Sequence, residues 1–376
     1  MVVSNGHQPD PRVQKEAEAL AAVGWSVEVH AFDRAANMPA YETMNGINII
    51  RHRVGATPYG GTVRTGLGLG RFRRTVIRAL RADAPAIVHC HDADTLAVGV
   101  AMERHGSRLV FDMHDLQHTW LLMPSPHSVW RRLASRLMCK RMLSRARRAD
   151  LVITSSGGVR PDGHPGFREW LADRGIPANG GAATVIENRP KVPDSTAPTP
   201  EKTTIGYIGT VREASMFSDL IDSLRLMPTD SRPAVRVAGR GVAQEQVSGM
   251  FAEASDIDSK VTGAFSNDEI PALMADVSIM YCVYPTGRGN IPEGAIATKM
   301  FDAAAHGRPS LVNSDCLMAD IASDESLGCS VSPSTPSSLL DKLQTMLTDP
   351  PEISLDPDWT EQAERLVAAY SGLRHD

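Results

Sequence analysis

Apolar and polar positions alternate along the chain with two periods, one typical of helices and one typical of strands. The first stripe has the i, i+4, i+7, i+8 spacing of a helix and consists of Val13, Ala17, Leu20 and Ala21. Asp10 followed by Pro11 supplies a cap and a first-turn proline, so a helix is expected to begin there. Residues 27–32 alternate as a strand, and residues 1–4 read as the end of an earlier one. The opening therefore predicts a β-α-β unit, whose ligands bind at the carboxyl end of the first strand.

The same alternation continues through the rest of the chain and is interrupted once. Further strands are predicted at residues 86–90, 108–111, 150–154, 204–208, 234–238, near 261, 277–281 and 310–312. Helices are predicted at residues 217–226, 244–254, 268–274, 296–306 and 357–370. The interruption is rich in Pro, Ser and Thr and has no periodicity, as a linker does. We predict an α/β fold of two doubly wound, Rossmann-like domains facing across a cleft, with bounds 1–191 (first domain), 192–203 (linker), 204–355 (second domain) and 356–376 (C-terminal helix).

Residues 54–72 are rich in glycine and arginine. We predict a mobile loop here that leads into a helix at residues 72–81. Two interpretations are open for this stretch: a solvated basic face, or part of the entrance to a binding site.

Composition limits the classes of function. The 376 residues are 42% apolar and 22% charged with a net charge of −5, which is ordinary for a soluble protein and gives no case for nucleic-acid binding. The five cysteines are widely spaced and contain no C-x-x-C pair, so we expect buried thiols in a reducing cytoplasm. No run of eighteen apolar residues could span a membrane, and residues 1–4 are too short for a signal peptide. We expect a cytoplasmic protein.

One predicted helix, residues 130–148, is unusually basic. Residues 131–148 hold eight basic side chains and no acidic one, and apolar residues recur among them at helical spacing. Such a helix can lie on an anionic membrane, and it can equally be the solvated face of an ordinary crossover helix. Both interpretations are open, so the protein is placed in the cytoplasm or at the inner face of the cell membrane.

The stretch 287–313 has the most pronounced local chemistry. A loop rich in Gly and Pro runs into the helix predicted at 296–306, and Gly307 is expected to end that helix. Thr298 and Lys299 occupy its first turn without an obvious cap, and Asp302 follows one turn later. Free backbone N–H groups, the positive end of the helix dipole and a lysine together predict a site for a diphosphate. The alternative is an ordinary β-α-β unit with a surface lysine.

Histidines and aspartates gather at the ends of two strands in the first half. His89, His91, Asp92 and Asp94 follow one another at the end of the strand predicted at 86–90, with both histidines on one face of that strand and either aspartate able to cap the next helix. His114 lies just past the next strand, where it points into the crevice of a parallel sheet. No third histidine follows at metal-site spacing, so we predict no bound metal.

Several of these stretches, taken together, resemble the retaining family 4 type of GT-B glycosyltransferase. Asp302-Ala-Ala-Ala-His-Gly-Arg-Pro309 is similar to the second half of the donor-binding motif of that family, with Asp in place of Glu. The first acid of the motif is expected at Gly294, and Glu293 lies one residue early. Lys299-Met-Phe-Asp302 is more similar to the Lys-x-Phe-Glu variant of the motif. Weaker matches in the same order cover nearly the entire chain, among them Ile-Val-His-x-His-Asp92 and Gly206-Tyr-Ile-Gly-Thr-Val-Arg212.

The resemblance assigns roles to particular residues. It implies catalytic roles for His114, Arg212 and Lys299, donor contacts at Gly6, Phe265, Glu293, Thr298, Lys299 and Asp302, and an acceptor side at His91, Asp92 and Trp120. The first domain would then face the acceptor, the second would bind the nucleotide sugar, and the C-terminal helix would cross back to the first. The family has a second cation in the loop of Arg212 that is absent here, and Lys299 is expected to take over its charge.

The implied activity is transfer of a hexosyl or N-acetylhexosaminyl group, with retention, from a UDP- or GDP-sugar to a hydroxyl. The acceptor would be a small molecule, a glycan or a lipid-linked compound, as in polysaccharide biosynthesis. No metal or other cofactor is expected, because side-chain cations would neutralise the leaving diphosphate. Three alternatives stay open: a nucleotide-sugar epimerase of the same fold, a metal hydrolase built on His89, His91 and Asp92, and a catalytically silent donor-binding subunit.

Overall fold

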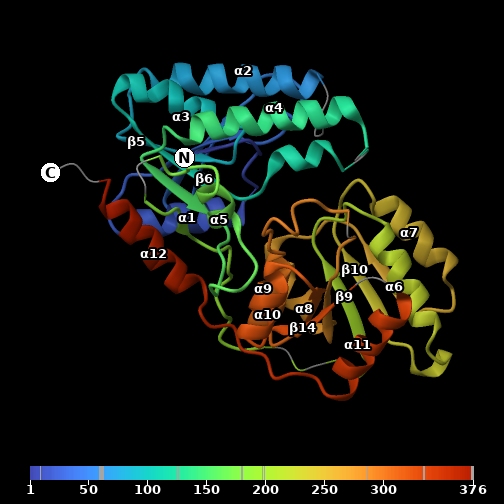
Figure 1. The fold of residues 1–376 in the computed structure, drawn as a ribbon. Helices are drawn as coiled ribbons and strands as arrows, with labels where there is room; N and C mark the ends of the chain where they lie inside the picture. The colour runs from blue at the N-terminus through green and yellow to red at the C-terminus, as the bar shows by residue number, and fades with distance from the viewer. Residues whose placement is uncertain are drawn as a thin grey trace. The chain divides into compact units, whose positions relative to one another are not determined.

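The chain forms two compact units, each built around its own sheet (Figure 1). A computed structural model describes residues 1–373 with the exception of 9, 59–62, 124, 126, 179–180, 197, 199, 286 and 333–334. Unit 1 consists of residues 1–157, 166–188 and 360–376, and unit 2 consists of residues 158–165 and 189–359. The α/β class and the two parallel-sheet domains expected from the sequence are confirmed.

Unit 1 has an eight-stranded sheet in the order β3-β4-β2-β1-β5-β6-β7-β8. Its strands are β1 (Val2–Val3), β2 (Glu28–Phe32), β3 (Tyr41–Met44), β4 (Ile47–His52), β5 (Ile87–His91), β6 (Arg108–Met113), β7 (Leu151–Thr154) and β8 (Thr184–Val185). Neighbouring strands are parallel except for β3 and β4 at the edge. Strands β2, β3 and β4 lie on one side of β1, and the chain then continues with β5 on the other side of β1. The topological switch point, where such sheets bind ligands, therefore lies between β1 and β5.

Helices cover both faces of this sheet. They are α1 (Pro11–Ala22), α2 (Val63–Leu80), α3 (Leu96–Met102), α4 (Val129–Ala146), α5 (Phe167–Ala172) and α12 (Trp359–Ser371), with the 3₁₀ turns η1 (Glu103–His105) and η2 (Gln117–Leu121). Figure 1 shows α2, α3 and α4 on one face and α1 and α12 on the other. The predicted start of α1 is confirmed, because the Asp10 carboxylate accepts from the Val13 N–H and Pro11 is the first helical residue.

The predicted mobile loop at residues 54–72 is wrong from residue 63 onward. Helix α2 begins at Val63 and runs through three glycines before the predicted start at residue 72. One of them, Gly68, lies against Thr57 so closely that a Cβ would be 2.3 Å from the Thr57 Oγ1. Phe72 is fully buried and its ring stacks on Phe32 with centroids 4.7 Å apart. Packing on the sheet thus overrides the low helix propensity of glycine.

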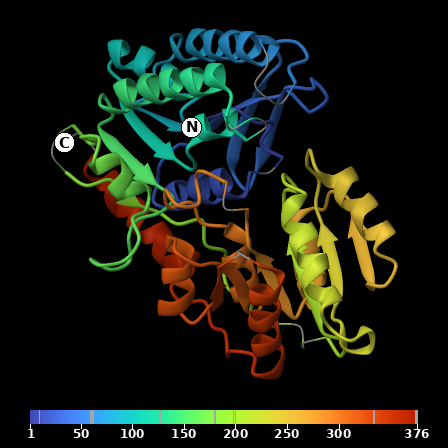
Figure 2. The ribbon, with the colours of Figure 1, turned by 45° about the vertical axis from the view of Figure 1, so that its right-hand side comes forward.

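Unit 2 has a six-stranded, fully parallel sheet in the order β11-β10-β9-β12-β13-β14. Its strands are β9 (Thr204–Ile208), β10 (Ala234–Ala238), β11 (Ser259–Thr262), β12 (Ile279–Cys282), β13 (Ser310–Asn313) and β14 (Gly328–Val331). Its helices are α6 (Ser215–Arg225), α7 (Gln244–Glu253), α8 (Ile270–Ala275), α9 (Thr298–Ala305), α10 (Leu317–Asp324) and α11 (Pro336–Thr348), with η3 (Thr229–Ser231) and η4 (Asn267–Glu269). Figure 2 shows α6 beside the strands of this unit. The switch point lies between β9 and β12.

Helix α9 begins and ends as its sequence predicts, to within two residues. It has no side-chain cap at Ala297, so its first-turn N–H groups carry no capping side chain. Gly307 follows in the left-handed region (φ 68°), and its N–H donates to the Ala304 carbonyl, as in a glycine-terminated helix. Within the described parts of both units, no helix combines the length and the apolar character needed to cross a bilayer.

Candidate functional site

Each unit carries a cluster of charged side chains at its own switch point. In unit 1 the centre of the cluster is Asp112, the fifth residue of β6, whose carboxylate is fully buried. Arg12 on α1 donates to it with Nη2 at 2.8 Å and Nε at 3.2 Å, and its Nη1 donates to the Ile186 carbonyl at 2.7 Å. Burial disfavours the ionised Asp112, but Arg12 and His114 outweigh it and hold the pKa of this carboxyl well below its usual range.

His114 is the member of this cluster nearest the surface, with a side chain that is 20% exposed. Its Nε2 lies 2.6 Å from the Asp112 Oδ2, and its Nδ1 lies 3.6 Å from the Asp92 Oδ2. Asp92, in the left-handed region (φ 65°), also accepts from the backbone N–H of His114 at 3.0 Å. Burial lowers the pKa of His114, but the two carboxylates outweigh it and raise that pKa to about 9.

The two histidines of β5 are buried and lie side by side. The rings of His89 and His91 stack with centroids 4.2 Å apart, as expected for residues on one face of a strand. The His89 Nδ1 lies 2.6 Å from the Tyr370 hydroxyl on α12, and the His91 Nδ1 lies 3.2 Å from the Asp112 Oδ2. Burial lowers the pKa of both imidazoles, so both rings are neutral near pH 7.

The predicted helix cap at Asp92 or Asp94 is wrong. Thr95 is the residue before α3, and no side chain caps that helix. The Thr95 hydroxyl instead donates back to the His91 carbonyl at 2.7 Å. The Asp92 carboxylate faces His114, as described above.

Among the residues that the structure describes, Glu16, His89, His91 and Asp112 form a group that could hold a metal ion, because each places one ligand atom within 4.8 Å of the others. The guanidinium of Arg12 already lies between the two carboxylates, 3.0 Å from Glu16 and 2.8 Å from Asp112. A divalent ion would have to share a buried site with this permanent cation, which is electrostatically costly. The geometry therefore fits an ion-pair network better than a metal centre.

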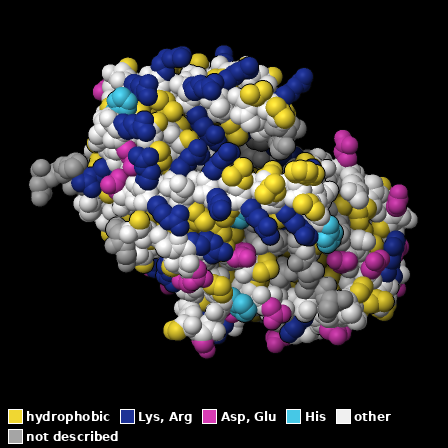
Figure 3. Space-filling model, turned by 45° about the horizontal axis from the view of Figure 1, so that its top comes forward, with side chains coloured by type: hydrophobic (Ala, Val, Ile, Leu, Met, Phe, Trp, Pro, Cys, Tyr) yellow, Lys and Arg dark blue, Asp and Glu magenta, His cyan; other side chains and the backbone are white. Residues whose placement is uncertain are grey.

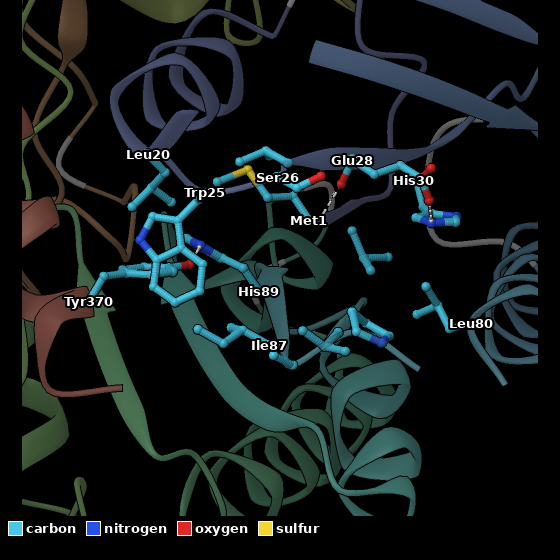
Figure 4. A pocket seen from close by; sticks show the side chains of 15 residues that line it. Met1, Leu20, Trp25, Ser26, Glu28, His30, Leu80, Ile87, His89 and Tyr370 are labelled. Atoms are coloured by element: carbon cyan, nitrogen blue, oxygen red, sulfur yellow. Dashed lines mark hydrogen bonds and ion pairs between the residues drawn. The ribbon is translucent and has the colours of Figure 1, made fainter. Parts of the chain in front are cut away.

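A pocket lies at the opposite edge of the same sheet. Figure 4 shows it where Glu28 and Ile87 begin β2 and β5, with Trp25, His89 and Tyr370 on one wall. The Trp25 ring meets the Tyr370 ring edge-on, with centroids 5.7 Å apart. These are the amino ends of the strands, and the pocket touches the switch-point cluster only through His89 and Tyr370. The predicted site residues other than the buried His89 do not line it.

Two further predicted residues of unit 1 lie near the carboxyl ends of the strands. Gly6 follows β1, and a Cβ there would be 2.6 Å from the Met38 Cε, so only glycine fits without a shift of Met38. Trp120, in η2, is 36% exposed and its indole N–H donates to the Asp115 carboxylate at 2.9 Å. The structure brings His91, Asp92 and His114 together, while the Trp120 indole contacts Asp115.

In unit 2 the corresponding feature is the buried side chain of Lys299 in the first turn of α9. Its ammonium lies over the Tyr207 ring at 3.1 Å and near the Tyr284 ring at 5.5 Å, both measured to the centroid. Among the described residues, no carboxylate forms an ion pair with it. Burial lowers the pKa of Lys299, but Tyr284 and Tyr207 outweigh it and the pKa is raised, so the side chain stays charged. A buried ammonium at an uncapped helix start is suited to an anion.

Two loops pack backbone against backbone beside this lysine. A Cβ on Gly239 would lie 1.8 Å from the Gly209 carbonyl oxygen, and a Cβ on Gly209 would lie 3.4 Å from the Lys299 Cε. Both glycines have positive φ, 143° at Gly209 and 147° at Gly239. Gly209 and Gly239 therefore let the two loops approach closely, and the end of β9 lies within reach of Lys299. Arg212, half-buried, follows three residues after Gly209 on the same loop.

The other predicted donor residues differ in exposure. Thr298 and Glu293 are exposed, whereas Phe265 and Asp302 are half-buried. Thr298 and Asp302 lie on the first turns of α9 with Lys299, Glu293 lies in the loop that precedes them, and Phe265 follows β11. Their contact with a donor remains a prediction.

Sequence reasoning missed several members of both clusters. In unit 1 these are Arg12, Glu16, Asp112 and Tyr370, and in unit 2 Tyr207, Tyr284 and Arg288. Arg288 stacks on the Tyr284 ring at 4.4 Å and faces Glu213 at 3.5 Å. A signal existed for one pair: Arg12 and Glu16 have i, i+4 spacing on the apolar face of α1, where charged residues need a buried partner.

Comparison with known proteins agrees with this architecture. Residues 9–179 match the model of the glycosyl transferase 4-like domain. No curated protein sequence matches the chain. Three similar solved structures share its fold over nearly its full length. They are sucrose-phosphate synthase from Thermosynechococcus elongatus (TM-score 0.72, 15% identity, 99% of this chain and 95% of that one), α,α-trehalose-phosphate synthase from Burkholderia xenovorans (0.61, 11%, 99% and 96%) and HepE from Anabaena in complex with UDP (0.60, 14%, 98% and 94%).

These likenesses cover both sheets, while the domain match falls within the first half of the chain. They agree with the order of weak motifs that runs from Asp10 to Pro309. The chain therefore has the GT-B fold of these structures, and its residues 9–179 are similar to a glycosyl transferase 4-like domain.

Proposed function

We propose that this protein transfers a hexosyl or N-acetylhexosaminyl group from a UDP- or GDP-sugar to a hydroxyl acceptor, with retention at the anomeric carbon. In this proposal unit 2 binds the nucleotide diphosphate at the start of α9, and unit 1 supplies His114, His91 and Asp92 at the carboxyl ends of β5 and β6. Both positions are switch points, where doubly wound sheets bind ligands.

The observation that carries the proposal is the buried ammonium of Lys299. Departure of the sugar leaves negative charge on the diphosphate, and a cation in a water-poor site stabilises that charge more than a solvated one. Lys299 is 92% buried, since its exposed fraction is 8%, and it lies at the positive end of the α9 dipole. Arg212, on the loop after β9, is proposed as the second cation.

The base of the donor is proposed from the relatives. HepE was solved with UDP, and the trehalose-phosphate synthase is described as UDP-forming. A UDP-sugar is therefore the first donor to test, with GDP-sugars second. Because the two side-chain cations neutralise the leaving group, we also propose that no metal is required. The position of Arg12 between Glu16 and Asp112 supports this for unit 1.

The decisive experiment is isothermal titration of UDP, GDP and their sugars into wild-type protein and Lys299→Met. Removing a charge-assisted contact to a phosphate should weaken nucleotide binding by roughly 10- to 150-fold. Lys342→Met, which removes an exposed lysine on α11, is the matched control and should bind as the wild type does. Wild-type affinity in Lys299→Met, or no binding of any UDP or GDP compound, would overturn the proposal.

Turnover assays separate the proposed transferase from its alternatives. A transferase releases nucleoside diphosphate faster when a hydroxyl acceptor is added. An epimerase of the same fold would turn over without acceptor, and a silent donor-binding subunit would bind nucleotide and release none. Activity that survives a strong chelator would support the metal-free proposal, whereas its loss would favour a metal hydrolase.

We further propose that residues 130–148 bring unit 1 into peripheral contact with a membrane that holds a lipid-linked acceptor. Helix α4 exposes four large apolar side chains on successive turns: Val129 (74%), Trp130 (80%), Leu133 (56%) and Leu137 (47%). Exposed basic residues flank them, namely Arg132, Arg136, Lys140 and Arg141. Figure 3 shows Lys and Arg side chains gathered over α2 and α4 with apolar side chains among them. An apolar stripe bordered by cations fits the interface of an anionic bilayer.

A further inference from the structure

The ring of His114 lies between two carboxylates. Its Nε2 faces the Asp112 Oδ2 at 2.6 Å, and its Nδ1 faces the Asp92 Oδ2 at 3.6 Å. The backbone of His114 is also fixed in place. The His114 N–H donates to the Asp92 carboxylate, and the His114 carbonyl accepts from the Ser155 hydroxyl. The Nε2 contact is a hydrogen bond and the Nδ1 contact lies within ion-pair distance, so both carboxylates favour the doubly protonated, positively charged ring over the neutral one.

Asp112 keeps its negative charge because Arg12 is fixed behind it. The guanidinium reaches both Asp112 oxygens and is anchored by the Ile186 carbonyl, and both side chains are buried. A paired, two-point contact of this kind holds the orientation of a carboxylate as well as its charge. The Asp112 Oδ2 therefore points at His114 without needing solvent to stabilise it.

The other imidazoles of the cluster do not compete for this role. His89 directs Nδ1 to the Tyr370 hydroxyl, and its Nε2 is 3.7 Å from Asp112, too far for a hydrogen bond. His91 reaches the same oxygen only at 3.2 Å and is fully buried, which keeps its ring neutral. His114 is thus the histidine whose charge this aspartate stabilises.

We propose that Asp112, backed by Arg12, is a positioning residue that fixes His114 as a doubly protonated, non-rotating cation at the carboxyl end of β6. This inference rests on the proposed function. It implies that His114 acts on a bound donor through its positive charge and cannot accept a proton from the acceptor hydroxyl. Acidic and basic groups surround the His114 ring. Helix α1 supplies Arg12 and Glu16, and the strand of His114 supplies Asp112. Strand β5 and the loop after it supply His89, His91 and Asp92.

The direct test is histidine NMR on the free protein, which needs neither donor nor acceptor. Long-range ¹H–¹⁵N spectra of protein labelled at histidine report the protonation of each ring nitrogen, and His114→Gln assigns the signal. In the wild type the His114 ring should stay doubly protonated at pH 8. In Asp112→Asn its pKa should fall by about two units or more, toward or below the ordinary value near 6.5.

Asp33→Asn is the matched control. Asp33 is equally buried in unit 1, but its carboxylate holds the N–H groups of residues 37 and 38 and does not face the cluster. The His114 signal should be unchanged in this variant. A neutral His114 in the wild type at pH 8, or an unchanged titration in Asp112→Asn, would overturn the inference. The wild-type measurement decides the question even if Asp112→Asn does not fold.

A kinetic arm applies where transfer is observed. Asp112→Asn should move the alkaline limb of the kcat/KM profile to lower pH by the same shift that NMR reports, and Arg12→Lys should move it less. A purely structural role would lower the melting temperature and leave the position of that limb unchanged. If no transferase activity is found, the NMR measurement still tests the charge of His114. Failure of the proposed function and failure of this inference are therefore distinguishable.

Discussion

At the scale of the residue, two glycines determine how closely two loops of unit 2 pack beside Lys299, where we propose that the diphosphate binds. Gly209 and Gly239 both have positive φ and meet backbone to backbone, and Lys299 packs directly against the first of them. A Cβ at Gly239 would overlap the Gly209 carbonyl and separate the ends of β9 and β10, whereas a Cβ at Gly209 would contact the Lys299 side chain. Glycine is therefore required here for close approach as well as for its backbone conformation.

This requirement predicts opposite effects for two glycine substitutions in the same unit. Gly239→Ala should lower the free energy of unfolding by more than about 2 kcal/mol, because its Cβ would overlap the Gly209 carbonyl at a strained φ. Gly249→Ala, on α7 with no atom within 4 Å of the added Cβ, should raise it by roughly 0.5–1 kcal/mol. Chemical denaturation measures both values. A neutral Gly239→Ala would show that these loops separate easily.

At the scale of the element, α4 exposes several large apolar side chains and buries few residues. Its buried residues are few, namely Ser135, Met142 and Ala146, while Val129, Trp130, Leu133 and Leu137 are exposed. A crossover helix stabilised only by its own sheet would bury Leu133 and Leu137. The exposed stripe is explained if a second surface covers it, as the proposed membrane contact would.

Sedimentation with vesicles tests that contact. Wild-type protein should bind vesicles containing anionic phosphatidylglycerol at low salt and bind neutral phosphatidylcholine much less. Trp130→Ala should reduce binding, and the triple variant Arg136→Gln, Lys140→Gln, Arg141→Gln should reduce it by about 100-fold, at about 1 kcal/mol per charge. Tyr41→Ala, which removes a 76% exposed aromatic ring elsewhere in unit 1, is the control. Equal binding to both kinds of vesicle would contradict an electrostatic contact.

At the scale of the whole molecule, the buried charges of unit 1 make its stability depend on pH. The pKa of His114 is raised to about 9, so its contribution is complete below about 6.5 and is lost as pH rises through 9. Burial, followed by the charge of Asp112, raises the pKa of Glu16 to about 8, so the folded state loses stability relative to the unfolded one as pH rises toward 8. In acid, His30 makes the folded state less stable. Burial lowers its pKa to about 3, whereas in the unfolded chain this side chain binds a proton below about 6.5, so stability is lost as pH falls from 6.5 toward 3.

Unit 1 should therefore unfold at a lower denaturant concentration at pH 9 than at pH 6.5. Tryptophan fluorescence can follow this, since Trp25, Trp120, Trp130 and Trp170 all belong to unit 1. Glu16→Gln keeps the shape of the side chain and removes its titration, so it should flatten the loss between pH 6.5 and 8. A midpoint that is constant over this range in the wild type would contradict the charge network.

Much of the fold could be predicted from the sequence, because residues only a few positions apart indicate where each helix and strand begins and ends. Strand β10 matches its predicted bounds of 234–238, and the cap at Asp10 and the stop at Gly307 lie where they were expected. Elements with weaker local patterns were missed, among them the antiparallel hairpin of β3 and β4 and the final β14. Helix α2 was mispredicted over residues 63–72, because the packing that stabilises it joins Phe72 to Phe32, 40 positions apart in the sequence.

The sequence by itself determined the alternation of strands and helices, the two parallel sheets and the chemistry placed after each strand. Periodicity, caps and turn residues act over a few positions, so they can be read without a structure. Only the tertiary structure decided how that chemistry is paired. Arg12 meets Asp112 and Lys299 meets Tyr207 across long stretches of chain, and these partners outweigh burial and keep Asp112 and Lys299 charged.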